Sequence, residues 1–228
     1  MKLLAALLLA STGALAIPNE ITAEYQVMNS GVKIGRVNET FTRRGDDYFI
    51  QSVTRSEGPL KLIFDDQVTL ESSGKIVGTG LKPLRFEQKR ARDPRRDVDA
   101  TFDWERAVMR STFRGESSEV PLPADTQDRL SLMYQFMRAR AVEGAMKVPM
   151  ANGRKVEIYT YRLVREERIT TPAGEFDTMH FERVTSTPNE SRADVWLAKD
   201  RFNFPVRIVF DDPKGFRLDQ MLVLLHTK

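Results

Sequence analysis

The chain has 228 residues, with 35 basic and 32 acidic side chains and a formal net charge of +3. This near balance argues against a general attraction to nucleic acid and leaves local basic patches as the only candidate anion-binding surfaces. The absence of cysteine excludes disulfides, zinc–thiolate sites and cysteine nucleophiles. A chain of this size buries roughly 70% of its unfolded surface, enough for one core, so we expect a single domain over residues 17–228.

The first sixteen residues are typical of a cleaved secretion signal. Lys2 provides the positive start, residues 3–10 form a short apolar run, and Ala14 and Ala16 are the small residues of a cleavage site. The run is far shorter than the ~20 residues that span a membrane, and a lipoprotein would need a cysteine at the cleavage point. The sequence therefore predicts a soluble periplasmic protein, cleaved after Ala16, that has no lipid anchor and no membrane span in its mature chain.

Alternation of apolar and polar residues dominates the rest of the chain. Between Asp97 and Trp104 every second side chain is apolar, and residues 204–210 repeat the pattern. A period of two indicates a strand with one buried and one wet face. Pro205 has no backbone N–H, so we expect it at a sheet edge or at the start of a strand.

Turn residues divide the chain into segments of about ten residues, the spacing typical of hairpin-connected antiparallel strands. The turn signals are Asn29–Gly31, Arg44–Asp47, Ser73-Gly74, Asp93-Pro94, Asn152-Gly153, Pro172–Gly174 and Asp212–Gly215. They predict about 10 to 13 strands. Because strands twist and open edges invite aggregation, such a sheet must curl or close, so we expect a mainly β protein with a curled antiparallel sheet or open barrel.

One segment departs from the strand pattern. From Asp125 to about Glu143 there is no proline or glycine, and apolar side chains recur at helical spacing. This stripe consists of Leu130, Met133, Met137 and Ala141. Asp125 or Thr126 is the expected N-cap, and Gly144 the expected stop. The pattern predicts one main α-helix packed on a face or mouth of the sheet.

The start of this predicted helix is unusually polar. Asp128 and Ser131 share a helix face, which Gln127 and Tyr134 approximately continue. These side chains either tie the helix to the sheet or line a cavity, and the same alternating strands would build a filled or a hollow barrel. If the barrel is hollow, the candidate ligand-binding residues are Phe102, Trp104, Gln127, Asp128, Ser131, Tyr134 and Trp196.

Residues 89–96 form the strongest basic cluster, through Arg90, Arg92, Arg95 and Arg96. They either keep a hairpin tip soluble or dock anionic headgroups, lipopolysaccharide phosphates or an acidic partner. No aromatic residue interleaves the arginines, so single-stranded nucleic acid is a poor candidate ligand.

No motif indicates a metal, a cofactor or a catalytic residue. His180 and His226 are far apart and neither has a second histidine at helical spacing. The chain has no G-x-S-x-G nucleophile elbow and no phosphate-binding loop. We therefore predict no cofactor, no metal and no catalytic residue, and keep as an alternative an unrecognised hydrolase that would use Asp128, Ser131 or His180.

Six segments in order along the chain resemble the domain of unknown function 3108 family of exported bacterial proteins. They are Gly80–Phe86, Thr101–Trp104, Gln127–Leu132, Thr171–Gly174, Val195–Ala198 and Phe204–Ile208. The resemblance covers nearly the whole mature chain. It implies a β-rich envelope protein of unassigned activity and supplies no catalytic residues.

These observations favour a non-enzymatic periplasmic protein that binds an apolar or amphipathic envelope molecule, such as a lipid, or assists envelope assembly. The predicted architecture is loosely similar to that of periplasmic lipoprotein carriers, although a fold does not dictate a function. The alternative is an interaction module that recognises an envelope protein or glycan through the basic hairpin 89–96.

Overall fold

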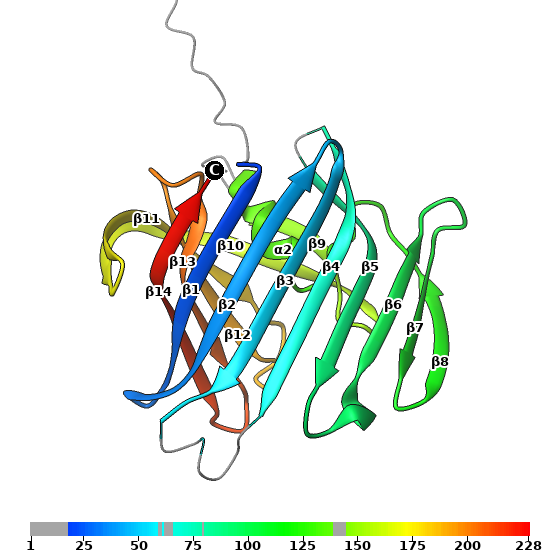
Figure 1. Cartoon of the computed structure of the whole chain (residues 1–228), viewed down its shortest axis with the longest axis horizontal. Helices are drawn as coiled ribbons and strands as arrows, with labels where there is room; N and C mark the ends of the chain where they lie inside the picture. Colours follow the sequence, from blue (N-terminus) through cyan, green and yellow to red (C-terminus); the bar gives the residue numbers. More distant parts are fainter. Residues whose placement is uncertain (1–17, 59–60, 62–65, 79, 139–144) are drawn as a thin grey trace, which may run out of the picture.

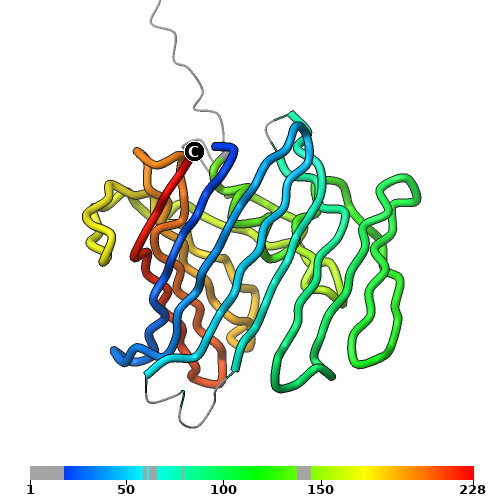
Figure 2. Tube along the Cα trace, in the orientation of Figure 1, coloured from blue at the N-terminus to red at the C-terminus, as the bar shows by residue number. Residues whose placement is uncertain are grey.

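The computed structural model describes residues 18–58, 61, 66–78, 80–138 and 145–228 (Figures 1 and 2). The predicted signal sequence and its cleavage site after Ala16 lie outside the described residues. One antiparallel sheet of 14 strands dominates the chain. This confirms the predicted fold class, with one strand more than the upper end of the expected number.

The strands fall into two groups separated by a short helical segment. The first group is β1 (Glu20–Asn29), β2 (Val32–Arg44), β3 (Asp47–Ser56), β4 (Gln67–Val77), β5 (Gly80–Arg90), β6 (Val98–Asp103), β7 (Val108–Phe113) and β8 (Glu116–Pro121). The second group is β9 (Ala145–Ala151), β10 (Val156–Thr171), β11 (Gly174–Val184), β12 (Arg192–Ala198), β13 (Phe204–Asp211) and β14 (Arg217–Thr227). A short 3-10 helix, η1 (Pro94–Arg96), lies between β5 and β6.

Most strands pair with their sequence neighbours, and β1 joins the two groups by pairing with β14. In the described part of the chain, β8 and β9 are the two edges of the sheet, so it curls without closing. The short helix α2 (Ser131–Gln135) and the 3-10 helix η2 (Phe136–Arg138) follow β8 and lie within the curl, between the strands drawn at the front and those drawn behind (Figure 1). We refer to residues 122–138 as the inner segment.

The helix is much shorter than predicted and begins at Ser131 instead of near Asp125. Neither expected N-cap is used, because Asp125 has a positive φ of 59° and the Thr126 hydroxyl donates to the Pro123 carbonyl. Gln127 instead forms an isolated parallel bridge to Met150 in β9. Tertiary pairing therefore overrides the helical pattern over its first turns, and residues 139–144 at its predicted end lie outside the described part of the chain.

The inner segment is buried on two sides, which explains why its side chains do not follow one helical stripe. Leu130 and Tyr134 belong to a core cluster that contains residues of β1–β7, β9 and β11–β14, whereas Leu132 and Phe136 belong to a second cluster with β9–β13. Both clusters consist largely of inward-facing residues from alternating strand positions. The space within the curl thus contains the inner segment.

Two further expectations about local structure need correction. Ser73-Gly74 is not a turn but lies inside β4 at a bulge, where a Cβ on Gly74 would lie only 2.2 Å from the Lys82 carbonyl oxygen. Pro205 occupies the second position of β13, which is an interior strand, so the expected strand start is confirmed and the edge position is wrong. The bulge beside Leu197 accommodates the proline without requiring its missing N–H.

Candidate functional site

A buried carboxylate fastens the start of the inner segment to the sheet. Asp128 is completely buried, and its Oδ2 accepts a hydrogen bond of 2.5 Å from the Ser72 hydroxyl in β4. Because Ser72 gives its proton to Asp128, the Tyr48 hydroxyl 3.1 Å away must donate to Ser72. These three residues form one hydrogen-bonded chain from β3 through β4 to the inner segment.

The second oxygen of Asp128 organises the turn that leads into α2. Its Oδ1 accepts hydrogen bonds of 2.8 Å from the backbone amides of Leu130 and Ser131, while the Asp128 amide donates to the Ser131 hydroxyl at 2.9 Å. Burial raises the pKa of Asp128 to about 6, against the opposing effect of the hydrogen bonds from Ser72 and the turn. Asp128 and Ser131 are thus hydrogen-bonded to each other, but they do not share a helix face, because Asp128 lies in the turn before α2 and Ser131 is the first residue of α2.

Gln127 joins the inner segment to both halves of the sheet. Its backbone N–H donates to the Pro149 carbonyl, and its carbonyl accepts from the Ala151 amide, both at 2.8 Å. Its side-chain amide donates to the Leu81 carbonyl at 2.9 Å, and the Leu81 amide in turn donates to Gln135 at 3.3 Å. The inner segment is therefore hydrogen-bonded to β9 at one edge and to β5 in the opposite half.

Tyr134 extends the buried polar contacts toward β2. Its ring stacks on Phe41 with a centroid separation of 4.9 Å, and its hydroxyl donates to Glu39 Oε1 at 3.1 Å. Glu39 is itself buried, and desolvation raises its pKa to about 7 although hydrogen bonds from Tyr134 and Ser52 oppose the rise. A second carboxylate is thus held inside the apolar core by a residue of the inner segment.

The predicted aromatic residues lie in different surroundings. Phe102 is buried in the same core cluster as Tyr134, and its ring stacks on Trp104 at 6.3 Å. Trp104 follows the end of β6, donates from Nε1 to the Pro83 carbonyl at 2.6 Å, and lies beneath Lys82. Trp104 is only partly buried, so it borders the core instead of filling it.

Trp196 belongs to the same core cluster as Phe102 and Tyr134, but its ring and indole N–H contact residues of β10 and β11. It stacks on His180 with ring centroids 4.1 Å apart, and its Nε1 donates to Glu167 at 2.9 Å. Strand alternation places these rings on the face opposite Phe181 of β11, which packs against the inner segment. His180 contacts Asp194 at 2.7 Å, with no contact to Asp128 or Ser131 among the described residues. The three residues of the hydrolase alternative are therefore not assembled.

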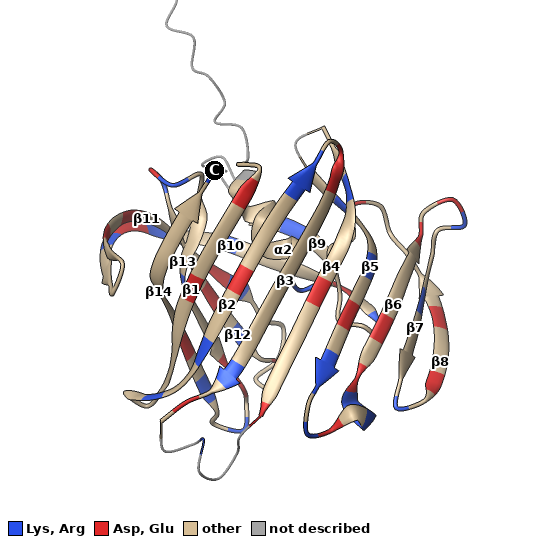
Figure 3. Cartoon of the chain, in the orientation of Figure 1, with Lys and Arg blue, Asp and Glu red and all other residues tan. Residues whose placement is uncertain are grey.

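The basic run 89–96 divides between two environments. Arg95 is highly exposed and pairs with Asp93 at 3.1 Å, and Arg96 lies in η1. Arg92 contributes its backbone amide to Asp66, whereas Arg90 ends β5 with its Nε buried and without a hydrogen-bond partner among the described residues. Figure 3 shows this concentration of basic residues at the end of β5 and in the following loop. The sequence pattern found the cluster but not the separation of Arg90 from the loop arginines.

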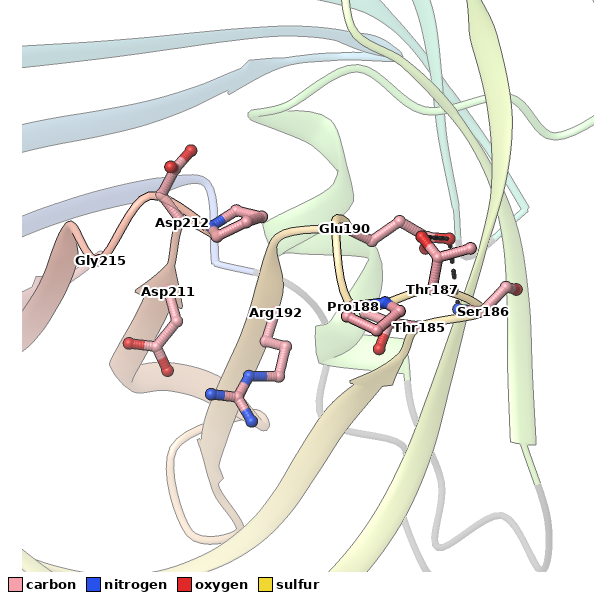
Figure 4. Close-up of a pocket in the computed structure, with 10 residues that line it drawn as sticks. Thr185, Ser186, Thr187, Pro188, Glu190, Arg192, Asp211, Asp212 and Gly215 are labelled. Carbon is pink, nitrogen blue, oxygen red and sulfur yellow. Dashed lines mark hydrogen bonds between the residues drawn. The ribbon is translucent and has the colours of Figure 1, made fainter.

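A polar groove between two surface turns was not anticipated from the sequence (Figure 4). It has a volume of about 660 Å³ and lies between residues 185–190 and the β13–β14 turn. Its carboxylates already have partners, since Glu190 accepts from the Ser186 amide and Asp211 pairs with Arg217 at 3.0 Å. Its residues come from two separate turns, so no local sequence motif identifies it.

The residues that the structure describes offer neither a metal site nor a membrane-spanning helix. No cluster of three or more histidine, aspartate or glutamate side chains in this part of the chain is arranged to hold a metal ion. Likewise, none of its helices is long and apolar enough to cross a membrane.

The fold and its buried contacts define a curled, open antiparallel sheet that surrounds a polar-tethered inner segment. The same type of architecture occurs in a crystal structure of a β-barrel-like protein of the DUF1849 family from Brucella abortus, with 14% identity and a TM-score of 0.60. That similarity covers 93% of this chain and 98% of the Brucella chain. A candidate lipoprotein from Parabacteroides distasonis also matches, with 10% identity over 92% of this chain and 96% of its own, but its TM-score is only 0.37.

The chain belongs to the DUF3108 family of proteins of unknown function, whose family model matches residues 21–221. This confirms the resemblance noted in the sequence. No match was found among curated proteins. The Brucella structure supports the fold alone, because its identity with this chain is low.

Proposed function

We propose that this chain is an exported, single-domain, non-enzymatic envelope protein that binds an amphipathic molecule, such as a lipid, on the concave face of its sheet. Binding would require the inner segment to move aside. The observation that supports this most directly is that buried polar groups, including Asp128 and Glu39, hold the segment within an apolar core.

A permanently filled core would be more stable with apolar side chains at these positions. Burial of a carboxylate costs free energy unless hydrogen bonds compensate fully, and the raised pKa values of Asp128 and Glu39 show that compensation is incomplete. When the segment leaves, water can replace its polar contacts. Displacing the inner segment from the sheet therefore costs less free energy than displacing a wholly apolar segment of the same size.

The sheet surface beneath the segment suits an apolar ligand. Phe41, Phe86 and Phe204 are all buried in the core cluster that surrounds Leu130 and Tyr134. Displacement of the segment would expose these rings to water, at a cost of roughly 25 cal/mol per Å² of apolar area. An acyl chain or another apolar group would offset this cost, whereas a purely polar ligand would not.

The connectivity permits the movement. The inner segment links the edge strands β8 and β9, so its displacement leaves the antiparallel strand pairs intact. Of its backbone contacts with the sheet, the bridge between Gln127 and Met150 would have to open. The lone pairs of Asp128 are used by Ser72 and the turn amides, which favours a structural role over catalysis.

A disulfide lock tests the proposal. The chain contains no cysteine, so a Gln127→Cys/Met150→Cys variant of residues 17–228 would carry one designed pair where the segment meets β9. We expect the reduced variant to bind a fluorescent fatty acid or short-chain phospholipid, and the oxidised variant to lose this binding. The matched control, Thr112→Cys/Ser117→Cys, joins paired residues of β7 and β8 and should bind equally in both redox states.

Analysis of lipids that co-purify with the protein from its native host is a second readout. Lipid recovery from the reduced protein, with loss on oxidation of the Gln127–Met150 lock, supports the proposal. Absence of bound lipid in all forms, together with no effect of added lipid on thermal unfolding, would refute it.

A further inference from the structure

An arginine of the inner segment meets the inward-facing end of β5. Arg129 immediately follows the buried Asp128, but its own side chain is exposed, and its Nη1 donates to Gln88 Oε1 at 3.2 Å. Gln88 and Arg90 are two residues apart on β5 and therefore share a face of the sheet. Arg129 and Arg90 thus approach the same region from different parts of the chain.

The β9–β10 turn brings a third arginine to this region. Gly153 has a φ of +85° and packs so closely on β6 that a Cβ there would lie 2.4 Å from Val98 Cγ1. Val98 pairs with Gln88 on one side and with Phe113 on the other. The next turn residue, Arg154, has its guanidinium carbon 4.8 Å from the Phe113 ring centroid. The contact made by Arg154 on β7 is therefore separated from the contact made by Arg129 on β5 by a single intervening strand, β6.

These three arginines have no carboxylate partner among the described residues, unlike many arginines elsewhere on the sheet. Arg110, Arg168 and Arg207, for example, pair with Glu119, Asp177 and Asp219 at 2.7, 2.9 and 2.6 Å. Two acids that contact the basic run 89–96 accept hydrogen bonds from backbone amides instead of guanidinium groups. Asp97 accepts from the Arg90 backbone amide at 2.8 Å, and Asp66 accepts from the Arg92 amide at 3.4 Å.

Because Arg90, Arg129 and Arg154 have no carboxylate partner among the described residues, their positive charges are not neutralised by an ion pair. Although Arg129 reaches the surface, its guanidinium is partly buried where it contacts Gln88; this desolvation, together with repulsion from Arg90 and Arg154, lowers the pKa of Arg129, and arginine remains protonated at neutral pH. The Arg90 Nε adds a buried donor without a partner among the described residues. Both the charge and the free donor would be satisfied by an anion that accepts several hydrogen bonds.

We propose that Arg90, Arg129 and Arg154 form a binding site for an oxyanion, either a phosphate or a carboxylate group. The planar guanidinium fork matches the spacing of phosphate and carboxylate oxygens and binds them through charge-assisted hydrogen bonds. The site lies at the end of the curl, where Arg129 and Arg154 are exposed, so the inner segment need not move to admit the anion. This inference goes beyond the proposed function and does not depend on it.

Inorganic phosphate is the direct probe. Thermal unfolding and titration calorimetry should show binding of phosphate to residues 17–228 beyond the effect of chloride at equal ionic strength. Arg129→Gln should weaken phosphate binding about tenfold or more, because it removes one charge-assisted donor pair. The control Arg110→Gln removes the same charge from an arginine that pairs with Glu119, and it should leave the phosphate affinity within twofold of wild type.

The unfolding temperature of each variant without phosphate shows whether a loss of phosphate binding is caused by misfolding. Arg129→Gln should leave the unfolding temperature in chloride unchanged or raised, because it relieves repulsion. Short-chain phosphatidylglycerol, compared with phosphatidylcholine and with phosphate alone, then distinguishes a lipid headgroup from a free anion. Either source supports the site. Equal effects of phosphate and chloride with no preference for phosphatidylglycerol, or equal loss in the Arg129 and Arg110 variants, would overturn it.

Discussion

Replacing Asp128 by asparagine should make the protein more stable at neutral pH, because the buried carboxylate opposes folding once it is ionised. Burial raises its pKa from an ordinary value of 3.8 to about 6. Each pH unit by which a pKa moves corresponds to about 1.4 kcal/mol, so the ionised side chain costs about 3 kcal/mol of folding free energy above pH 6. Asparagine keeps an oxygen for the amides of Leu130 and Ser131 and can donate to Ser72.

The sign of the pH dependence follows from the raised pKa. Between pH 4 and pH 6 the folded protein binds more protons at Asp128 than the unfolded chain does, so this group's contribution to stability falls as the pH rises through that interval. The difference in unfolding free energy between Asp128→Asn and wild type should therefore be small near pH 4 and approach about 3 kcal/mol in favour of the variant above pH 7.

Urea unfolding, followed by the fluorescence of Trp104 and Trp196 at several pH values, measures this difference. The exposed Asp200→Asn variant controls for the loss of a carboxylate. A constant difference across pH 4 to 8, or a less stable Asp128→Asn variant at pH 7.5, would contradict the burial argument. It would instead indicate that the charged hydrogen bond from Ser72 outweighs the desolvation of the carboxylate.

Substitutions at three other positions test the packing of the core and of the sheet. Glu39→Gln should raise the unfolding free energy by up to about 3 kcal/mol at pH 8 and by much less near pH 5, because burial raises the pKa of Glu39 from 4.5 to about 7. Urea unfolding at pH 5 and at pH 8 measures this difference. Tyr134→Phe keeps the stack on Phe41 and should cost about 1 kcal/mol, whereas Tyr134→Ala should cost about 3 to 5 kcal/mol; similar losses in urea unfolding would refute the packing role. Gly74→Ala forces a Cβ against the Lys82 carbonyl and should lower the unfolding free energy by more than about 2 kcal/mol; an unchanged thermal unfolding temperature would contradict the close approach.

The strands that the sequence predicts well are those in which one face is buried. In β6, the buried residues Val98, Ala100 and Phe102 follow the expected alternation. The outer strand β8 lacks this signal, because nearly all of its side chains are exposed and its sequence contains no apolar run. A count based on alternation therefore underestimates the number of strands at the open edge.

The inner segment shows why local periodicity predicts the wrong length of helix. Its apolar residues have helical spacing, but the bridge of Gln127 to Met150 and the turn around Asp128 fix the chain before a helix can begin. The partner of Asp128, Ser72, is 56 residues away. Such contacts depend on the curl of the whole sheet and have no signal in a local sequence window.

Neighbouring residues of the inner segment connect the two proposed binding regions. Asp128 is buried against β4, while the next residue, Arg129, is exposed beside Gln88 at the end of β5. An anion held by Arg129, Arg90 and Arg154 would add contacts between the inner segment and the sheet in the filled arrangement. Suppose that a ligand binds only when the segment is displaced. By linkage, the factor by which this ligand weakens anion binding then equals the factor by which the anion weakens binding of the ligand. Because binding on the concave face requires the inner segment to move aside, the concave face and the arginine site are expected to compete, so that phosphate weakens lipid binding and lipid weakens phosphate binding.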